Sequence, residues 1–310
     1  MKGFKIGIKG NATRIATGLG LSLPLLLAGP AARAVLDLGP AADFAVFQLG
    51  TTTAGGSWTS SNVTINGDVG FRSTGPGGNS STIVNGNVQG TVTPSAFAGR
   101  NWTVSGSYTQ LPDATLQTIA QQARDFSAAA VAAGVGLPTL ASVGNSTGSY
   151  TFTSANLAEP GTYILSVTGS LSLTGGNNFT LNGSMLPAGS RVIVNVASGF
   201  SLSGGSQVNL TGGLTPSQVL FNYTGTSAAG ASGGSAGTAI FGTFLGINAN
   251  ANFNAAATVV YGSLITQSVN LSSGITIQGI PFIPEPSSVM AGMLLLVPFG
   301  ASALRIVRKC

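Results

Sequence analysis

Few side chains in this 310-residue chain could take part in catalysis, and their types exclude most catalytic arrangements. The sequence contains no histidine, and its single cysteine is Cys310. A Ser-His-Asp or Cys-His nucleophile therefore cannot be assembled, and the body of the chain offers zinc neither imidazole nor thiolate. A pair of carboxylates could still act as acid and base on a polysaccharide, and Asp68 and Asp43 are the candidates.

Asp68 also has a simpler interpretation, as a turn residue. It ends the run Asn66-Gly67-Asp68, and Asn87 takes the same place in the later run Asn85-Gly86-Asn87. Asp37 and Asp43 are too isolated to suggest a calcium site. The sequence therefore predicts no catalytic residue, no metal site and no cofactor, and we expect that the protein is not an enzyme. A polysaccharide-cleaving enzyme is the least favoured function.

Rows of hydroxyl side chains could form a binding surface instead. Alternate residues of a strand share one side, so on a regular coil the rows could make a flat array that meets ice or a polysaccharide. Outward positions of any β-surface also favour threonine, so the rows alone do not decide the function. Trp58 and Trp102 could stack on sugars or lie in the core. The rows are Thr51–Thr53, Thr91 with Thr93, Thr151 with Thr153, and Ser170 with Ser172 and Thr174.

Short β-strands separated by glycine or asparagine turns carry these side chains. Apolar residues alternate with serine, threonine or asparagine along most of residues 35–283, which is the period of a half-buried strand. The Asn-Gly step at Asn66 recurs at Asn85, and this spacing is typical of one solenoid turn. Asn-Gly is also a hairpin signal, so a β-sandwich is the alternative to the β-solenoid that we predict. On successive turns we expect Ile65, Val84 and Val104 to point inward, with Gly67, Gly86 and Gly106 at matching corners.

Residues 113–133 break this pattern and predict one long α-helix. The segment has no glycine, and its apolar residues recur at helical spacing. Asp113 is the expected N-cap and Gly134 the expected terminator. The helix should pack along the side of the coil or cap one end, whereas residues 73–81 and 225–237 read as loops. The predicted buried stripe is Leu116, Ile119, Ala120, Ala123, Phe126 and Ala130.

The electric charge lies mostly at the two ends of the chain. The whole chain carries a net charge of +5, but residues 35–283 contain four arginines and six acidic residues, a net of −2. This body has no basic patch for phosphates, so we exclude nucleic-acid binding. Without cysteine it also has no disulfide, and its length suits one domain, which we place at residues 35–283.

The N-terminal segment, residues 1–34, has the pattern of a secretory signal peptide. A basic start is followed by a mostly apolar stretch, 15–28. Ala32 and Ala34 fit a small-x-small cleavage site, with Val35 as the first mature residue. A permanent N-terminal anchor is less favoured because the apolar stretch is short.

Residues 284–310 combine a motif, an apolar segment and a basic end. Pro284-Glu285-Pro286 precedes the apolar run 289–304, which predicts a C-terminal transmembrane helix. Basic residues after the run keep that end in the cytoplasm. This order of motif, apolar segment and basic end resembles the PEP-CTERM sorting signal. The alternative interpretation is a plain C-terminal membrane anchor. The basic stop consists of Arg305, Arg308 and Lys309.

Four stretches of the body and one helix inside a β-repeat carry a family resemblance. The stretches are Ala41–Val46, Val63–Gly70, Gly242–Phe253 and Val260–Ile265. With them the body resembles the ice-binding-like adhesive domain of choice-of-anchor A surface proteins. The resemblance implies an all-β fold, a right-handed β-solenoid with one flanking helix. It also implies a surface or adhesive role, and it supplies no catalytic residues.

Together these patterns predict an exported cell-surface or extracellular-matrix protein with a structural or adhesive role. The PEP-CTERM resemblance implies processing by an exosortase, with the C-terminal helix in the inner membrane before processing and the mature protein at the cell envelope or outside the cell. Exopolysaccharide or another surface polymer is the expected partner, in a biofilm setting. The alternative is an ice-binding protein that uses a threonine-rich solenoid face.

Overall fold

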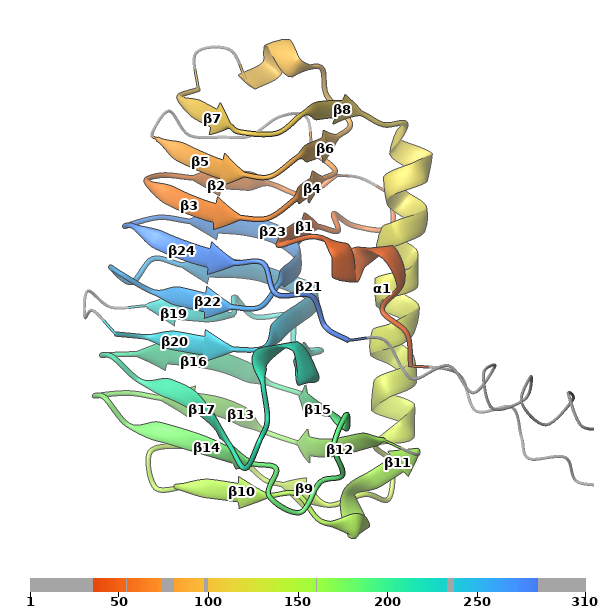
Figure 1. The fold of residues 1–310 in the computed structure, drawn as a ribbon, viewed down its shortest axis with the longest axis vertical. Helices are drawn as coiled ribbons and strands as arrows, with labels where there is room; N and C mark the ends of the chain where they lie inside the picture. The colour runs from red at the N-terminus through yellow and green to blue at the C-terminus, as the bar shows by residue number, and fades with distance from the viewer. Residues whose placement is uncertain are drawn as a thin grey trace, which may run out of the picture. The chain divides into compact units, whose positions relative to one another are not determined.

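The computed structural model describes residues 36–53, 55–73, 81–97, 100–159, 161–232 and 237–283. In these ranges parallel β-sheets and one long α-helix dominate (Figure 1). The described elements are η1 (Gly39–Asp43), β1 (Val46–Gln48), β2 (Trp58–Ser60), β3 (Val63–Asn66), β4 (Val69–Phe71), β5 (Thr82–Asn85), β6 (Val88–Gly90), η2 (Pro94–Phe97), β7 (Trp102–Val104), β8 (Tyr108–Gln110), α1 (Asp113–Ala133), β9 (Thr139–Leu140), β10 (Ser149–Thr151), η3 (Ser154–Asn156), β11 (Leu157–Glu159), β12 (Thr162–Val167), β13 (Ser170–Leu173), β14 (Asn178–Asn182), β15 (Arg191–Val196), β16 (Gly199–Ser203), β17 (Gln207–Thr211), η4 (Pro216–Gln218), β18 (Val219–Tyr223), β19 (Gly230–Ser232), β20 (Ala239–Phe241), β21 (Thr243–Phe253), β22 (Val259–Tyr261), β23 (Leu264–Leu271) and β24 (Ile275–Gln278).

The described strands form a twelve-stranded, a nine-stranded and a three-stranded sheet. The twelve-stranded sheet runs β11-β12-β15-β18-β21-β23-β1-β4-β6-β8, with β2 beside β23 and β9 beside β12. The nine-stranded sheet runs β10-β14-β17-β20-β22-β24-β3-β5-β7, and the three-stranded sheet runs β13-β16-β19. Strand pairs are parallel except β11 with β12 among the described strands. The predicted mostly-β fold with one helix is confirmed.

The helix α1 explains why the strand order differs from the chain order. The chain first adds β4, β6 and β8, returns along the side of the sheets as α1, and then builds back from β12 to β23 (Figure 1). The late strand β23 thereby becomes the parallel neighbour of the early strand β1. The N-terminal and C-terminal parts of the domain therefore meet in the middle of the sheets.

Two hydrophobic clusters stabilise this arrangement. The larger one lies among the inward-facing side chains of the sheets, for example Ile65, Val194 and Ile240. The second lies between the twelve-stranded sheet and α1, where Ile164 and Ile193 meet the helix. On the predicted stripe of α1, Ile119 is half-buried and the other residues are buried, and Ser127 joins them. The stripe prediction and the side-packed helix are thus confirmed.

Buried amides bind α1 near its C-terminal end. The Ser127 hydroxyl donates to Oδ1 of Asn222 over 2.6 Å, and Nδ2 of Asn222 donates to Oδ1 of Asn195 over 2.8 Å. Nδ2 of Asn195 donates to the Ala130 carbonyl of the helix over 2.9 Å. The buried amides of Asn195 and Asn222 thus have hydrogen-bond partners, which offset the cost of burying them.

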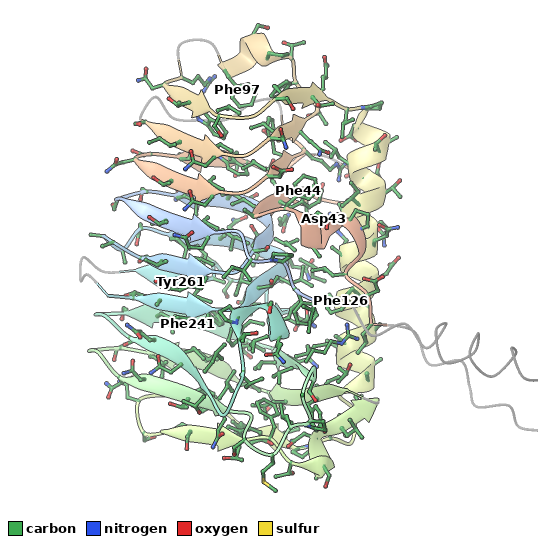
Figure 2. The ribbon with its side chains drawn as sticks, in the orientation of Figure 1. Asp43, Phe44, Phe97, Phe126, Phe241 and Tyr261 are labelled. Carbon is green, nitrogen blue, oxygen red and sulfur yellow. The ribbon has the colours of Figure 1, made fainter. Side chains whose placement is uncertain are left out.

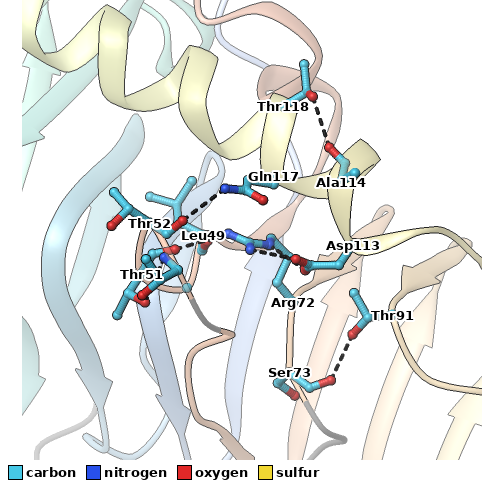
Figure 3. Close-up of polar contacts among 12 residues, drawn as sticks. Leu49, Thr51, Thr52, Arg72, Ser73, Thr91, Asp113, Ala114, Gln117 and Thr118 are labelled. Atoms are coloured by element: carbon cyan, nitrogen blue, oxygen red, sulfur yellow. Dashed lines mark hydrogen bonds and ion pairs between the residues drawn. The ribbon is translucent and has the colours of Figure 1, made fainter.

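A buried arginine binds the start of α1 (Figure 3). The guanidinium of Arg72, whose side chain is 0% exposed, meets Asp113 at 2.9 and 3.0 Å and donates to the Leu49 and Thr51 carbonyls. Gln117 donates to the carbonyl of Thr52 over 2.9 Å. The Arg72 hydrogen bond lowers the pKa of Asp113, and the nearby positive charge adds to the effect.

The predicted N-cap is wrong by one residue. Asp113 is the first helical residue, and Pro112, with an extended backbone at φ −56° and ψ 141°, takes the cap position. Asp113 instead supplies negative charge to the first turn, where it faces Arg72. Gly134 ends the helix as predicted, and its N–H donates to the carbonyls of the last turn.

The predicted repeat is confirmed in the register of the nine-stranded sheet. Ile65 pairs with Val84, and Val84 pairs with Val104. Ile65 and Val84 are fully buried, whereas Val104 is half-buried on the edge strand β7. The three corner glycines stack closely, because a Cβ on Gly86 would lie 2.4 Å from the Gly67 carbonyl oxygen.

Two terminal predictions and parts of both loop predictions lie outside the described residues. These are the signal segment 1–34, the sorting segment 284–310, residues 74–80 of the loop 73–81 and residues 233–236 of the loop 225–237. Within the ranges that the structure describes, no helix is long and apolar enough to cross a membrane. The predicted loop 225–237 is partly wrong, because β19 pairs with β16 there through backbone hydrogen bonds that small residues also make.

Candidate functional site

The outward side of the nine-stranded sheet is the candidate binding surface, and we call it the nine-strand face. Its inward neighbours, such as Ile65, Val84 and Ile240, fill the core, so the alternate residues point outward. One row consists of Asn178, Gln207, Ala239, Val259, Thr276, Thr64, Ile83 and Thr103. The other row consists of Ser149, Thr180, Asn209, Phe241, Tyr261, Gln278, Asn66 and Asn85.

No residue in either row of the nine-strand face is charged. The two rows contain hydroxyls and amides together with a few apolar side chains, and Ile83 is 38% exposed. The comparable outer side of the twelve-stranded sheet is covered by α1. The nine-strand face is therefore a broad, neutral surface that the described helix leaves open.

An aromatic pair lies in the middle of this face (Figure 2). Phe241 on β20 and Tyr261 on β22 are register partners, with ring centroids 4.8 Å apart and planes 4° from parallel. Both residues are partly exposed. Each is followed by a glycine, and a Cβ on Gly262 would lie 2.1 Å from the Gly242 carbonyl oxygen. Glycine at this corner permits the close approach of the two turns that stacks the rings.

A row of amides continues from the aromatic pair along the same register. Nδ2 of Asn66 donates to Oε1 of Gln278 over 3.0 Å, and Nδ2 of Asn85 donates to Oδ1 of Asn66 over 2.8 Å. Gln278 is the register partner of Tyr261. Thr276 and Thr64 are paired in the adjacent row. The face thus changes from apolar to hydrogen-bonding along one direction of stacked strands.

The predicted hydroxyl rows do not combine into one array. Thr151 lies on the nine-stranded sheet, whereas Ser170 and Ser172 lie on the three-stranded sheet. The carbonyls of Thr51 and Thr52 accept bonds from Arg72 and Gln117 beside the helix. The alternation of apolar and polar residues along a strand predicts whether a side chain faces the core or the solvent. The position of the residue within the turn decides which of the sheets it belongs to. The Thr91 hydroxyl donates to the Ser73 carbonyl, the Thr93 hydroxyl contacts Ser95, and the Thr153 hydroxyl bonds Asn156.

Neither predicted tryptophan forms an open sugar platform. Trp58 is 2% exposed, and Trp102 is half-buried against it with ring centroids 5.8 Å apart. Phe97 packs on Trp102 and on Tyr108, so the aromatic residues fill the end of the core. Burial raises the pKa of Tyr108 to about 12, and its hydroxyl donates to the Val92 carbonyl.

The carboxylate of Asp68 has structural partners in the described part of the chain. Oδ1 of Asp68 accepts from the Asn87 backbone N–H over 2.7 Å and from its side chain over 3.1 Å. Oδ1 of Asn87 in turn accepts from the Ser107 N–H over 3.0 Å. Asp68 therefore stabilises stacked turns, as its turn interpretation expects. Asp37 and Asp43 line a hollow of about 390 Å³, and no group of metal-ligating residues occurs within the described ranges.

The sorting and cleavage residues fall outside the described ranges. These are Ala32, Ala34, Val35, Pro284, Glu285, Pro286, Arg305, Arg308 and Lys309. Their proposed roles remain predictions. Among the described residues, sequence reasoning did not single out Phe241 and Tyr261. The repeat of an aromatic residue before glycine, first as Phe241-Gly242 and again as Tyr261-Gly262, could have indicated them.

The family comparison agrees with the body resemblance. A family described as "Putative Ice-binding-like adhesive domain" matches residues 37–277. The chain belongs to this family. No curated protein matches it. The family description names no enzymatic activity.

Solved ice-binding proteins align with most of this chain. A protein from an Antarctic Flavobacteriaceae bacterium is 20% identical, with a TM-score of 0.50 over 81% of this chain and 48% of that chain. An ice-binding protein from the ascomycete Antarctomyces psychrotrophicus is also 20% identical, with a TM-score of 0.49 over 79% and 98%. A glycosylated ice-binding protein from an Arctic yeast is 16% identical, with a TM-score of 0.47 over 82% and 97%. At 20% identity, the likeness to the Flavobacteriaceae protein concerns the fold.

Proposed function

We propose that this ice-binding-like adhesive domain is a right-handed β-solenoid that attaches to a surface polymer or partner through the nine-strand face. The observation that carries the proposal is the contrast between two large sheets. Helix α1 covers the outside of one, whereas the other presents neutral side chains that no described element covers. Partly exposed apolar side chains that gather on one face, here Phe241, Tyr261 and Ile83, are a feature of interaction sites.

Ice binding is the second candidate. The family description and the similar structures support it at least as well as they support adhesion. A flat parallel sheet with paired Thr276 and Thr64 on its outside is compatible with an ordered ligand. The aromatic pair and Ile83 interrupt any regular hydroxyl spacing, and this irregularity favours a polymer over ice.

We further propose that the domain acts outside the cytoplasm as an exosortase-processed protein. The support is the sequence alone, namely the signal pattern of residues 1–34 and the motif, apolar run and basic stop of residues 284–310. Processing would separate the domain from its C-terminal helix and release the domain to the cell surface or the matrix.

A charge placed on the nine-strand face tests its role. Thr64→Lys introduces a solvated charge on the outer row, and Ser172→Lys introduces the same charge on the outside of the three-stranded sheet. Beads coated with the full chain would be incubated with the host's extracellular matrix, and retained beads counted. We expect Thr64→Lys to reduce retention and Ser172→Lys to leave it unchanged. Equal retention by all three proteins would contradict the proposed face.

The same three proteins separate the two candidate functions. Purified full chain would be added to a frozen sucrose solution, and the growth of ice grains followed by microscopy. The adhesive proposal expects grain growth equal to that in a protein-free sample. Inhibition of growth that Thr64→Lys abolishes and Ser172→Lys preserves would instead establish ice binding on the same face.

A further inference from the structure

We propose that Phe241 and Tyr261, with the adjacent amides of Gln278, Asn66 and Asn85, form a subsite for an extended neutral glycan. The inference rests on the proposed adhesive function of the nine-strand face, and it names the class of ligand. These five residues occupy one continuous register across β20, β22, β24, β3 and β5.

The aromatic pair supplies the apolar end of the subsite. Two parallel rings with centroids 4.8 Å apart cover one face of each other, and both residues remain partly exposed. Figure 2 shows both on the same side of the stacked strands. Val259 extends this apolar area in the neighbouring row. A pyranose ring has an apolar face of C–H groups, which packs on aromatic surface while its hydroxyls stay hydrated.

The amide row supplies the hydrogen-bonding end. A side-chain amide has two N–H donors and an oxygen with two lone pairs. Asn66 donates one bond and accepts one, Gln278 accepts one, and Asn85 donates one. Each amide therefore retains capacity beyond these bonds, and the bonds hold the amides in fixed orientations. The hydroxyls of Thr276 and Thr64 lie in the adjacent row. Pre-oriented donors and acceptors suit the hydroxyls of a sugar chain.

The absence of charge in both rows selects among polymers. An acidic polysaccharide or a nucleic acid would meet no cationic side chain there, and a basic peptide would meet no carboxylate. A neutral glycan needs neither a cationic side chain nor a carboxylate on the protein surface. Neighbouring strands lie about 4.8 Å apart, so five strands span roughly 19 Å between the outermost residues. The subsite is therefore long enough for an oligosaccharide segment and not only for a single sugar.

The competing interpretation is that the ladder only stabilises the fold. Stacked aromatic residues and asparagine rows do stabilise parallel strands. That interpretation predicts that substitutions in the ladder lower the thermal midpoint and leave ligand affinity unchanged. Affinity and thermal midpoint must therefore be measured on the same samples.

Affinity electrophoresis provides the test. The full chain would be purified in a detergent without a sugar headgroup and run in native gels that contain barley β-glucan, galactomannan or, as an acidic comparison, alginate. We expect at least one neutral polysaccharide to retard the protein and alginate to leave its mobility unchanged. The double variant Phe241→Ala/Tyr261→Ala should bind about tenfold more weakly, whereas the control Val135→Ala, at a 79% exposed position outside the nine-strand face, should bind like the unaltered chain.

Each outcome bears on the proposal. If the double variant does not fold, Gln278→Leu replaces it, and we expect about fivefold weaker binding from the loss of one amide. Retardation that is equal for all folded variants would overturn the subsite. Failure of both neutral polysaccharides, or retardation by alginate alone, would overturn the ligand class. If Thr64→Lys still reduced bead retention in either case, the adhesive function of the face would stand without this subsite.

Discussion

Replacing Val84 by threonine tests which side chains face the core. Val84 is 0% exposed, and its register partners are Ile65 and Val104. Threonine has nearly the same shape, so Val84→Thr leaves the packing volume almost unchanged and places a hydroxyl among apolar side chains. Burial of a hydroxyl without a hydrogen-bond partner costs about 1–3 kcal/mol. For a domain of this size, a loss of about 2 kcal/mol lowers the thermal midpoint by roughly 4–8 °C.

The matched control is Ile83→Thr. Ile83 is the adjacent residue on the same strand, points to the opposite side and is 38% exposed. Substitutions at such surface positions usually change the free energy of unfolding by about 0.5 kcal/mol or less. Thermal unfolding followed by circular dichroism should therefore show a large shift for Val84→Thr and a small one for Ile83→Thr. Similar shifts for both variants, or the reverse order, would refute the inward and outward assignment of β5.

Three further predictions concern an ion pair, a tyrosine and the C-terminal segment. Asp113→Ala leaves the buried Arg72 guanidinium without its carboxylate and should lower the free energy of unfolding, measured in urea, by about 1–3 kcal/mol. This loss is below the usual range for buried pairs because Asp113 is 54% exposed. The control Asp125→Ala should lower it far less. Because the pKa of Asp113 is lowered in the folded protein, its stabilisation is present above the ordinary aspartate pKa and should be lost as the pH falls through the lowered value. Burial raises the pKa of Tyr108 to about 12, so the protonated side chain stabilises the folded protein fully below the ordinary tyrosine pKa near 10. This stabilisation should be lost as the pH rises from about 10 to 12. The prediction is contradicted if the free energy of unfolding of Tyr108→Phe depends on pH in that range as strongly as that of the unaltered chain. Finally, the intact mass of protein recovered from the host's envelope should lack the residues after the Pro-Glu-Pro motif, and a mass that includes Cys310 would rule out processing.

The periodic parts of the fold were predictable because local patterns determine them. The spacing of Leu116, Ala120 and Ala123 on one helical stripe indicated both the helix and its buried side. The regular repeat of Asn-Gly steps indicated that Ile65 and Val84 would pair. In both cases the spacing of the apolar residues follows the repeat of the backbone structure. A single sequence is therefore sufficient to infer that structure.

The features that depend on distant segments were not predictable in this way. Pro112 takes the cap position, and Asp113 contacts Arg72, which lies 41 residues away in the sequence. The pairing of β23 with β1 joins segments far apart in the chain. The candidate site has the same origin, because Gln278, the register partner of Tyr261, lies beside Asn66 only after the chain has returned along α1. The spacing of residues within one segment does not show which distant segment that segment will pair with.

The most direct test of the account is to identify which side chains a bound surface polymer covers. Hydroxyl-radical footprinting of the full chain, with and without the polymer that retains it, would report this by mass spectrometry. We expect protection of Phe241 and Tyr261, while Met185 and Val135, which are 65% and 79% exposed and lie outside the nine-strand face, should react equally in both samples. Protection at Met185 or Val135 with unchanged reactivity at Phe241 and Tyr261 would contradict the nine-strand face as the binding surface.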